Sequence, residues 1–344
     1  MARKKSEPTP QHISDISDSR PPATVPTQAA AGDTSPATPS VPPMTKGQRA
    51  VALAAMPSDT AVLAGTFIGL LVLTSAYFLI NAAFGADTDP MYPTALRMAF
   101  GLIGGIIVFA VILAVGMFII RMQRQAMLGN AMQVEYSDYA WLRDWANVVA
   151  VDLELPRVEI FVTQNPVINA YAFGFINPYC IVLHSGSIRY LSQDELKSVV
   201  VHEMAHIKYG HTIASVYLQP FITIPVVSIV TGWIAGFWQR RCEYTADRLA
   251  LTYMNDATLV KNALVKVHIG PDTADGMNEI ARQWMQYTAE RPMNRFAQTF
   301  SSHPFLVRRL SHIDRMAQAF GINTASAAVT DQSTNTQRPS SAAA

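Results

Sequence analysis

Hydrophobic and polar positions divide the chain into segments of different character. Residues 60–86 carry no charged side chain, and the stretch 61–80 is long enough, at about 1.5 Å per residue, to cross about 30 Å of hydrocarbon. A second uncharged run, 98–120, lies between two arginines and has a similar length. The two runs predict a transmembrane hairpin over residues 60–121.

The pattern beyond the hairpin is that of a globular domain, which we place at residues 125–320. Residues 125–155 have the mixed periodicity of an amphipathic helix. Residues 157–163 alternate between apolar and polar, and 179–184 form a short β-prone run, so a small sheet is expected. From Ser192 onward the pattern is almost wholly helical. The predicted fold class is mainly α with a small β-sheet, preceded by the two-helix hairpin.

Both ends of the chain have the composition of disordered segments. Residues 1–48 hold nine of the 21 prolines among Ser, Thr, Ala and Gln, and residues 323–344 are small and polar. Over the whole chain, half of the residues are apolar and 15% are charged, against about 25% in ordinary soluble domains, which agrees with membrane segments. A net charge of +1 gives no electrostatic argument for nucleic-acid binding, and two cysteines exclude a disulfide-stapled scaffold.

Charges around the hairpin predict its orientation. The loop between the two apolar runs carries two aspartates and one arginine, whereas each outer flank carries two basic residues. Because basic residues are retained on the cytoplasmic side, both outer flanks are expected there. This predicts a multi-pass protein of the inner (plasma) membrane whose globular domain faces the cytoplasm.

A helix with metal-binding spacing follows the predicted sheet. Ser192 and Glu195 fit a capping box, which starts a helix near residue 193. The tenth residue of this helix begins H-E-x-x-H, in which His202 and His206 lie one turn apart on one face and can reach one zinc ion. Glu203 can accept a proton from water, the general-base role of a metallopeptidase. Two structural histidines on a buried helix face are the alternative.

A catalytic zinc site needs a third protein ligand, and Glu243 is the candidate. Glu243 and Asp247 are one helical turn apart, so the first can bind metal while the second hydrogen-bonds a ligand from behind. A surface carboxylate pair is the alternative. His211, five residues past His206, would be rotated away from the metal-binding face and is expected to be a helix-end histidine.

Several separated segments resemble the HtpX-like membrane zinc metallopeptidases, relatives of the CAAX prenyl proteases. The resemblance runs from about residue 156 to about residue 310. Its segments are N-A-Y-A-F-G at 169–174, I-V-L-H-S-G at 181–186, the approach L-S-Q-D-E-L at 191–196 to H-E-M-A-H, E-Y-T-A-D at 243–247, and S-H-P at 302–304 followed by Arg309.

The resemblance implies a zincin-like domain with one zinc ion per chain. It assigns His202, His206 and Glu243 as zinc ligands, Glu203 as the base and Asp247 to the shell behind the ligands. These roles are carried over from the matching motifs.

The resemblance also implies residues that act on the substrate. His303, a catalytic candidate, and Arg309 would lie where a donor stabilises an oxyanion or holds the substrate, although His303 is equally a helix-start histidine on sequence alone. Asn169 would hold the substrate backbone or simply turn the chain. In zincin folds the peptide adds as a strand to a sheet edge, and we expect 179–184 to be that edge.

One segment departs from the family pattern. Relatives commonly have two further spans before the glutamate ligand, but only 28 uncharged residues, 212–239, are available here, and two crossings need about 40. A single crossing would put Glu243 on the opposite side of the membrane from His202. We therefore expect no full crossing, with Pro220 and Pro225 dividing the run into two short helices, packed in the core or forming a re-entrant hairpin.

These patterns together predict a membrane-anchored zinc endopeptidase. Its expected partners are the lipid bilayer and polypeptide substrates, in particular misfolded or cleaved membrane proteins, as in protein quality control. One alternative is a membrane-anchored chaperone or binding module with a non-catalytic metal site, which the intact Glu203 disfavours. The other is a CAAX-type prenyl protease, which the small membrane portion disfavours.

Overall fold

The computed structural model describes residues 44–84, 93–173, 179–223 and 225–322. The predicted tails lie outside these residues, except for residues 44–48, of which 46–48 already belong to helix α1 (Lys46–Ala54). The side chain of Thr45 accepts from the backbone N–H of Gln48, and the Gln48 side chain accepts from that of Thr45. This capping box starts α1 before the tail composition ends.

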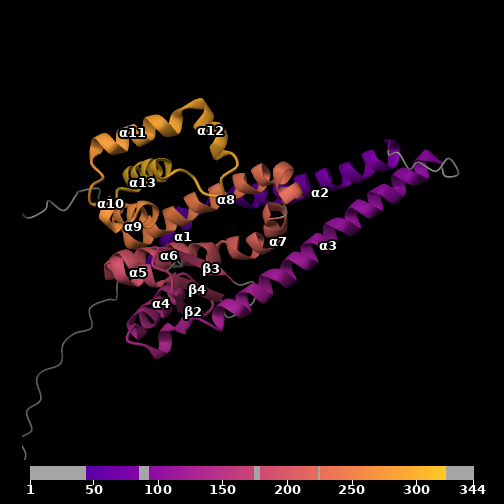
Figure 1. The fold of residues 1–344 in the computed structure, drawn as a ribbon. Helices are drawn as coiled ribbons and strands as arrows, with labels where there is room; N and C mark the ends of the chain where they lie inside the picture. The colour runs from indigo at the N-terminus through magenta and orange to yellow at the C-terminus, as the bar shows by residue number, and fades with distance from the viewer. Residues whose placement is uncertain (1–43, 85–92, 174–178, 224, 323–344) are drawn as a thin grey trace, which may run out of the picture. The chain divides into compact units, whose positions relative to one another are not determined.

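Two long apolar helices follow α1 and contain the predicted spans (Figure 1). Helix α2 (Asp59–Phe84) and helix α3 (Thr94–Leu128) are both long and apolar enough to cross a membrane. They pack closely where α3 has small residues, since a Cβ on Gly105 would lie 2.9 Å from the Cα of Ser75. Helix α3 continues past the predicted run.

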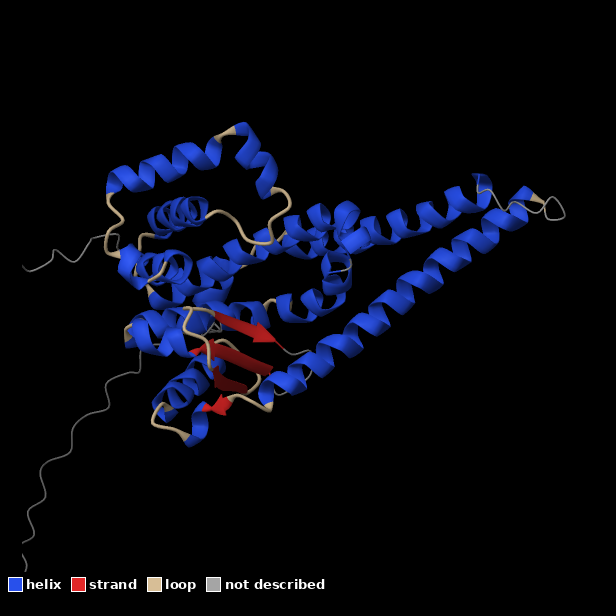
Figure 2. Cartoon of the chain, viewed as in Figure 1, coloured by secondary structure: helices blue, strands red, loops and turns tan. Residues whose placement is uncertain are grey.

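The sheet has four strands in the order β1-β2-β4-β3 (Figure 2). Strand β2 (Val158–Thr163) pairs parallel with β4 (Tyr179–His184), whereas β1 (Met132–Gln133) and β3 (Ala170–Phe173) pair antiparallel with β2 and β4 respectively. The prediction that 179–184 forms the edge is therefore wrong, because β4 is interior and β3 is the edge.

The side chains of β4 explain its interior place. Ile181 and Leu183 are buried in the main core, while Cys180 and Val182 are buried on the opposite face against the end of α3. A strand that is apolar on both faces is stable between two neighbours and covered on both sides.

Helices form the rest of the domain around the main core. The predicted helix over 125–155 is the end of α3, then β1, a 3-10 turn (Val134–Tyr136) and α4 (Ala140–Asp152). The capping box at Ser192 is confirmed, and α6 begins at Gln193. The further helices are α5 (Ser185–Tyr190), α6 (Gln193–Lys208), α7 (His211–Thr223), α8 (Pro225–Met254), α9 (Ala257–Ile269), α10 (Pro271–Ala274), α11 (Glu279–Glu290), α12 (Pro292–Gln298) and α13 (Leu306–Phe320).

The apolar run 212–239 divides at one proline. Helix α8 begins at Pro225, as the missing N–H of proline favours, whereas Pro220 lies inside α7. The second helix is 30 residues long, so the expectation of two short helices holds only for α7. Helices α6 and α8 contact each other extensively, which agrees with a run that makes no single crossing.

Candidate metal centre

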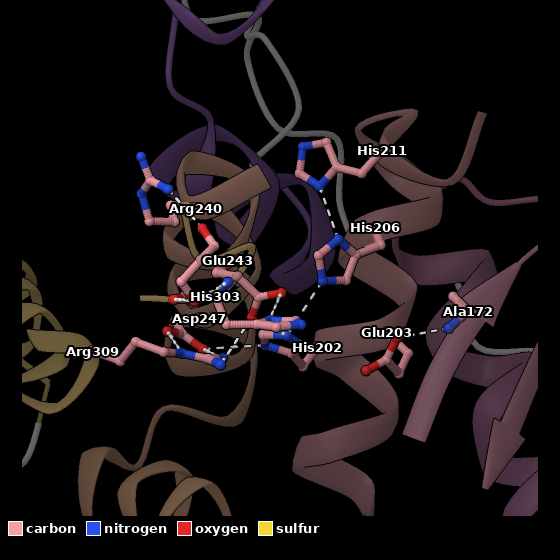
Figure 3. A network of polar contacts seen from close by, with 11 residues as sticks. Ala172, His202, Glu203, His206, His211, Arg240, Glu243, Asp247, His303 and Arg309 are labelled. Atoms are coloured by element: carbon pink, nitrogen blue, oxygen red, sulfur yellow. Dashed lines mark hydrogen bonds and ion pairs between the residues drawn. The ribbon is translucent and has the colours of Figure 1, made fainter. Parts of the chain in front are cut away.

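Helices α6 and α8 bring the three predicted ligands together (Figure 3). His202 Nε2 lies 3.3 Å from His206 Nε2 and 3.5 Å from Glu243 Oε2, and one donor atom from each residue lies within 4.8 Å of the others. Zinc bonds of about 2.0–2.1 Å in a tetrahedron put donors about 3.3 Å apart. The donor set and its spacing therefore fit one zinc ion, and among the described residues it is the one such cluster of three.

Asp247 lies behind His202, as its spacing predicted. Its Oδ1 is 3.2 Å from His202 Nδ1, which directs Nε2 toward the other donors. Burial lowers the pKa of His202, but hydrogen bonds with Asp247 and Glu243 outweigh it and raise the pKa to about 10. A metal ion would therefore compete with a proton for this histidine.

Arg309 is buried between two carboxylates. Its Nε and Nη2 donate to Asp247 at 2.8 and 2.6 Å, and its Nη1 lies 2.9 Å from Glu243 Oε2. Burial raises the pKa of Glu243 and of Asp247, but the arginine charge and the hydrogen bonds to these carboxylates together outweigh it and hold both pKa values below their ordinary range. Arg309 thus lies near the site as expected, with its nitrogens engaged by protein carboxylates.

Glu203 faces the edge strand. Its Oε2 accepts a 2.8 Å hydrogen bond from the backbone N–H of Ala172 on β3. Burial raises the pKa of Glu203, which makes it a stronger base than an exposed carboxylate. The carboxylate is thereby fixed between the histidines of α6 and the sheet edge.

His303 and Asn169 line the same cavity of about 720 Å³ as the three donors. His303 Nδ1 is 2.9 Å from Glu243 Oε1, and the histidine side chain is 64% exposed. The Glu243 carboxylate raises the pKa of His303. Asn169 is exposed just before β3, and its backbone N–H and C=O both bond the Ser187 hydroxyl.

His211 lies at a helix end and outside the donor set, as predicted, but the prediction that it is rotated away from the site is wrong. Its Nδ1 lies 3.1 Å from Nδ1 of His206, and its buried ring stacks on Tyr209 and meets the edge of Trp238. Helix α6 ends at Lys208, and Gly210 has a φ of +70°, so His211 starts a new helix and its ring returns to His206. In the sequence, Gly210 was the signal that α6 ends before His211.

Comparison with known proteins agrees with this geometry. The profile of Peptidase family M48 matches residues 137–317, more than half of the chain. Plastoglobule-localized metallopeptidase 48 of Arabidopsis thaliana is 29% identical over 56% of this chain and 61% of its own length. A protease HtpX homolog of Fusobacterium nucleatum is 24% identical over 50% of this chain and 68% of its own, and protease HtpX of Shewanella oneidensis is 27% identical over 49% and 61%.

Among solved structures, the crystal structure of S. mikatae Ste24p aligns over 75% of this chain and 67% of that chain, with a TM-score of 0.41 and 18% identity. The chain spans about six tenths of the length of the plant relative. Because the profile match covers more than half of the chain, the chain belongs to peptidase family M48, and it is similar to HtpX proteases.

Proposed function

We propose that the chain is a membrane-anchored zinc endopeptidase that hydrolyses peptide bonds in misfolded or cleaved membrane proteins. The observation that carries this proposal is the convergence of His202, His206 and Glu243 beside a buried Glu203. A purely structural zinc site is closed by four protein ligands and has no use for a base beside it. Three donors leave a fourth position open toward the cavity.

His202, His206 and Glu243 would hold the ion, and zinc, when bound, supplies Lewis acidity toward water and toward the peptide carbonyl. Glu203 would take the proton of the attacking water and pass it to the leaving nitrogen, because its carboxylate is fixed beside the edge strand. Asp247 would keep His202 in the ligating tautomer.

The remaining predicted residues divide into two roles. His303, exposed on the cavity and bonded to Glu243, would donate to the substrate carbonyl oxygen as charge develops there. Arg309 would position Glu243 and Asp247, since its buried guanidinium bonds both, in place of the substrate contact expected from sequence. Asn169 would hold the substrate backbone at the start of β3.

The substrate would add as an extended strand along the free edge of β3. Among the described strands, β3 pairs with β4 alone, and the backbone N–H of Ala172 donates to Glu203. Main-chain pairing gives affinity without demanding one sequence, so broad specificity is expected.

Helices α2 and α3 would anchor the domain to the inner (plasma) membrane with the site on the cytoplasmic face. Support comes from the length and apolar character of both helices and from the basic residues that flank them outside the connecting loop. The α7–α8 pair packs on both helices and would dip into the bilayer from the cytoplasmic side.

The test compares wild type with Glu203→Gln and with Glu290→Gln, an exposed glutamate on α11. Each purified protein is assayed for zinc content and for cleavage of casein in detergent. We expect about one zinc ion in all three and cleavage by wild type and Glu290→Gln alone. Absence of zinc from wild type, or equal cleavage by Glu203→Gln, would refute the proposal.

A further inference from the structure

Five large apolar side chains are exposed on α8, on α12 and just after α12. Their exposed fractions run from 49% to 75%. Exposing this much large apolar surface to water is unfavourable, so such residues often mark a contact with a partner or a membrane. We call this set the aromatic surface, and its members are Trp233, Phe237, Met293, Phe296 and Phe300.

Helix α8 places part of the aromatic surface beside the predicted span of α2. The two helices run antiparallel, because Arg241 bonds Asp59 at the start of α2 while Ile234 lies against Gly69 further along it. A Cβ on Gly69 would be 3.8 Å from Ile234 Cδ1. Gly69 lies about 12 Å along the predicted span at 1.5 Å per residue, so Trp233 is at hydrocarbon depth if α2 crosses a bilayer.

The chain after α12 contacts α8 at Gly236 and Arg240, about one to two turns past Trp233 and so closer to the start of α2. Arg240 Nη1 donates to the carbonyl oxygens of Thr299 and Ser301 at 2.9 and 2.6 Å. A Cβ on Gly236 would lie 3.1 Å from the Ser301 carbonyl oxygen, so the chain after α12 rests directly on α8. Phe300 lies between the two bonded carbonyls in sequence.

We propose that the aromatic surface contacts the phospholipid bilayer and seats α12 in its interfacial region; this rests on the proposed membrane insertion of α2 and α3. Tryptophan and phenylalanine are favoured at that depth, and a short helix there buries its apolar face about 5–10 Å into the headgroup boundary. Arg291 and Arg295, both exposed at α12, supply cations for lipid phosphates.

This contact would also fix the cavity relative to the membrane. His303 follows Phe300 by three residues, and the Ser301 hydroxyl donates to the His303 carbonyl at 2.8 Å. A bilayer that holds Phe300 therefore holds the segment that carries His303 against Glu243. Substrates would then enter the cavity at the membrane surface.

Site-directed spin labelling tests the proposal on the full chain. Both native cysteines are buried, so unmodified protein provides the labelling blank. Phe296→Cys and Met293→Cys report on α12. Ile68→Cys, 62% exposed on α2, is the span control, and Val151→Cys, 78% exposed on α4, is the apolar control far from the spans. Each protein is reconstituted in phosphatidylcholine–phosphatidylglycerol vesicles, and the accessibility of its label to oxygen and to a water-soluble chromium complex is measured.

We expect the oxygen-to-chromium accessibility ratio at residues 293 and 296 to approach that at residue 68 and to exceed that at residue 151 several-fold. A ratio at 293 and 296 equal to that at 151 would overturn the proposal while leaving the anchor intact. Protection from both reagents would also overturn it, because a second copy or another protein would then cover the surface. A low ratio at residue 68 would instead refute membrane insertion itself.

Discussion

Replacing Arg309 by Met removes the charge that two buried carboxylates share. Methionine has a similar unbranched shape, so the change tests charge and hydrogen bonding rather than volume. The side chains of Arg309, Asp247 and Glu243 are 4%, 3% and 10% exposed, and three bonds of 2.6–2.9 Å join them. Without the arginine, both carboxylates stay buried with only histidines as partners.

Breaking a buried ion pair by removing one partner costs about 3–5 kcal/mol, a large share of the about 5–15 kcal/mol that holds a typical domain together. We expect Arg309→Met to lower the free energy of unfolding of the metal-free protein by about that amount. The loss should be smaller with zinc bound, because the ion brings positive charge to Glu243.

Urea unfolding in detergent, followed by tryptophan fluorescence with and without zinc, measures both effects. Arg308→Met is the matched control, because Arg308 donates to the carbonyl of Ala289 at 3.3 Å and forms no ion pair with a carboxylate among the described residues. Its expected cost is below about 1 kcal/mol. Equal costs for the two arginines would refute the reasoning, and equal losses with and without zinc would refute its electrostatic part.

Three further predictions concern the shell around the site. His211→Ala should weaken zinc binding about 10–100-fold, because the His206 ring would lose the contact that holds it. Competition with a chelator measures the zinc affinity. An unchanged affinity would mean that His211 contributes to packing alone. Burial raises the pKa of Asp247, but Arg309 outweighs it, so the stability from this carboxylate is complete above its ordinary pKa of about 3.9 and is lost as pH falls through the lower folded value. The melting temperature of the metal-free protein should therefore fall more steeply below about pH 4 in wild type than in Asp247→Asn. Gly186→Ala should lower the free energy of unfolding by about 1–3 kcal/mol, because the added Cβ would overlap the backbone of Pro166. Gly232→Ala should not lower it, because the space around Gly232 is open. Differential scanning calorimetry compares the two variants.

Helix α6 could be predicted because its sequence signals are local. The capping box at Ser192 and the four-residue spacing of His202 and His206 depend only on α-helical geometry, and α6 begins where they place it. The prediction that Glu243 and Asp247 lie one turn apart rests on the same α-helical geometry. That Glu243 meets the histidines depends on how α8 packs on α6, which only the resemblance supplied before the structure.

The sheet edge was not predictable from the strength of individual strands. Residues 179–184 have the stronger β pattern, yet strong apolar character on both faces is what places a strand in the interior. Strand β3 has four half-buried residues and no comparable pattern, because an edge strand has one neighbour. The orientation of the His211 ring was predicted wrongly for a different reason. The prediction extended the helical period of α6 past Gly210, where the helix has already ended.

The third donor of the metal centre is tied to the base of the first apolar helix. Arg241 and Thr245, each two residues from Glu243, both bond Asp59, the first residue of α2, at 2.8 and 2.7 Å. His202 and His206 lie on α6, a different helix. A displacement of α2 relative to α6 would therefore pass through these two bonds to Glu243 and change its 3.5 Å separation from His202. If α2 is inserted in a bilayer as proposed, its placement would therefore influence the position of Glu243 in the metal centre.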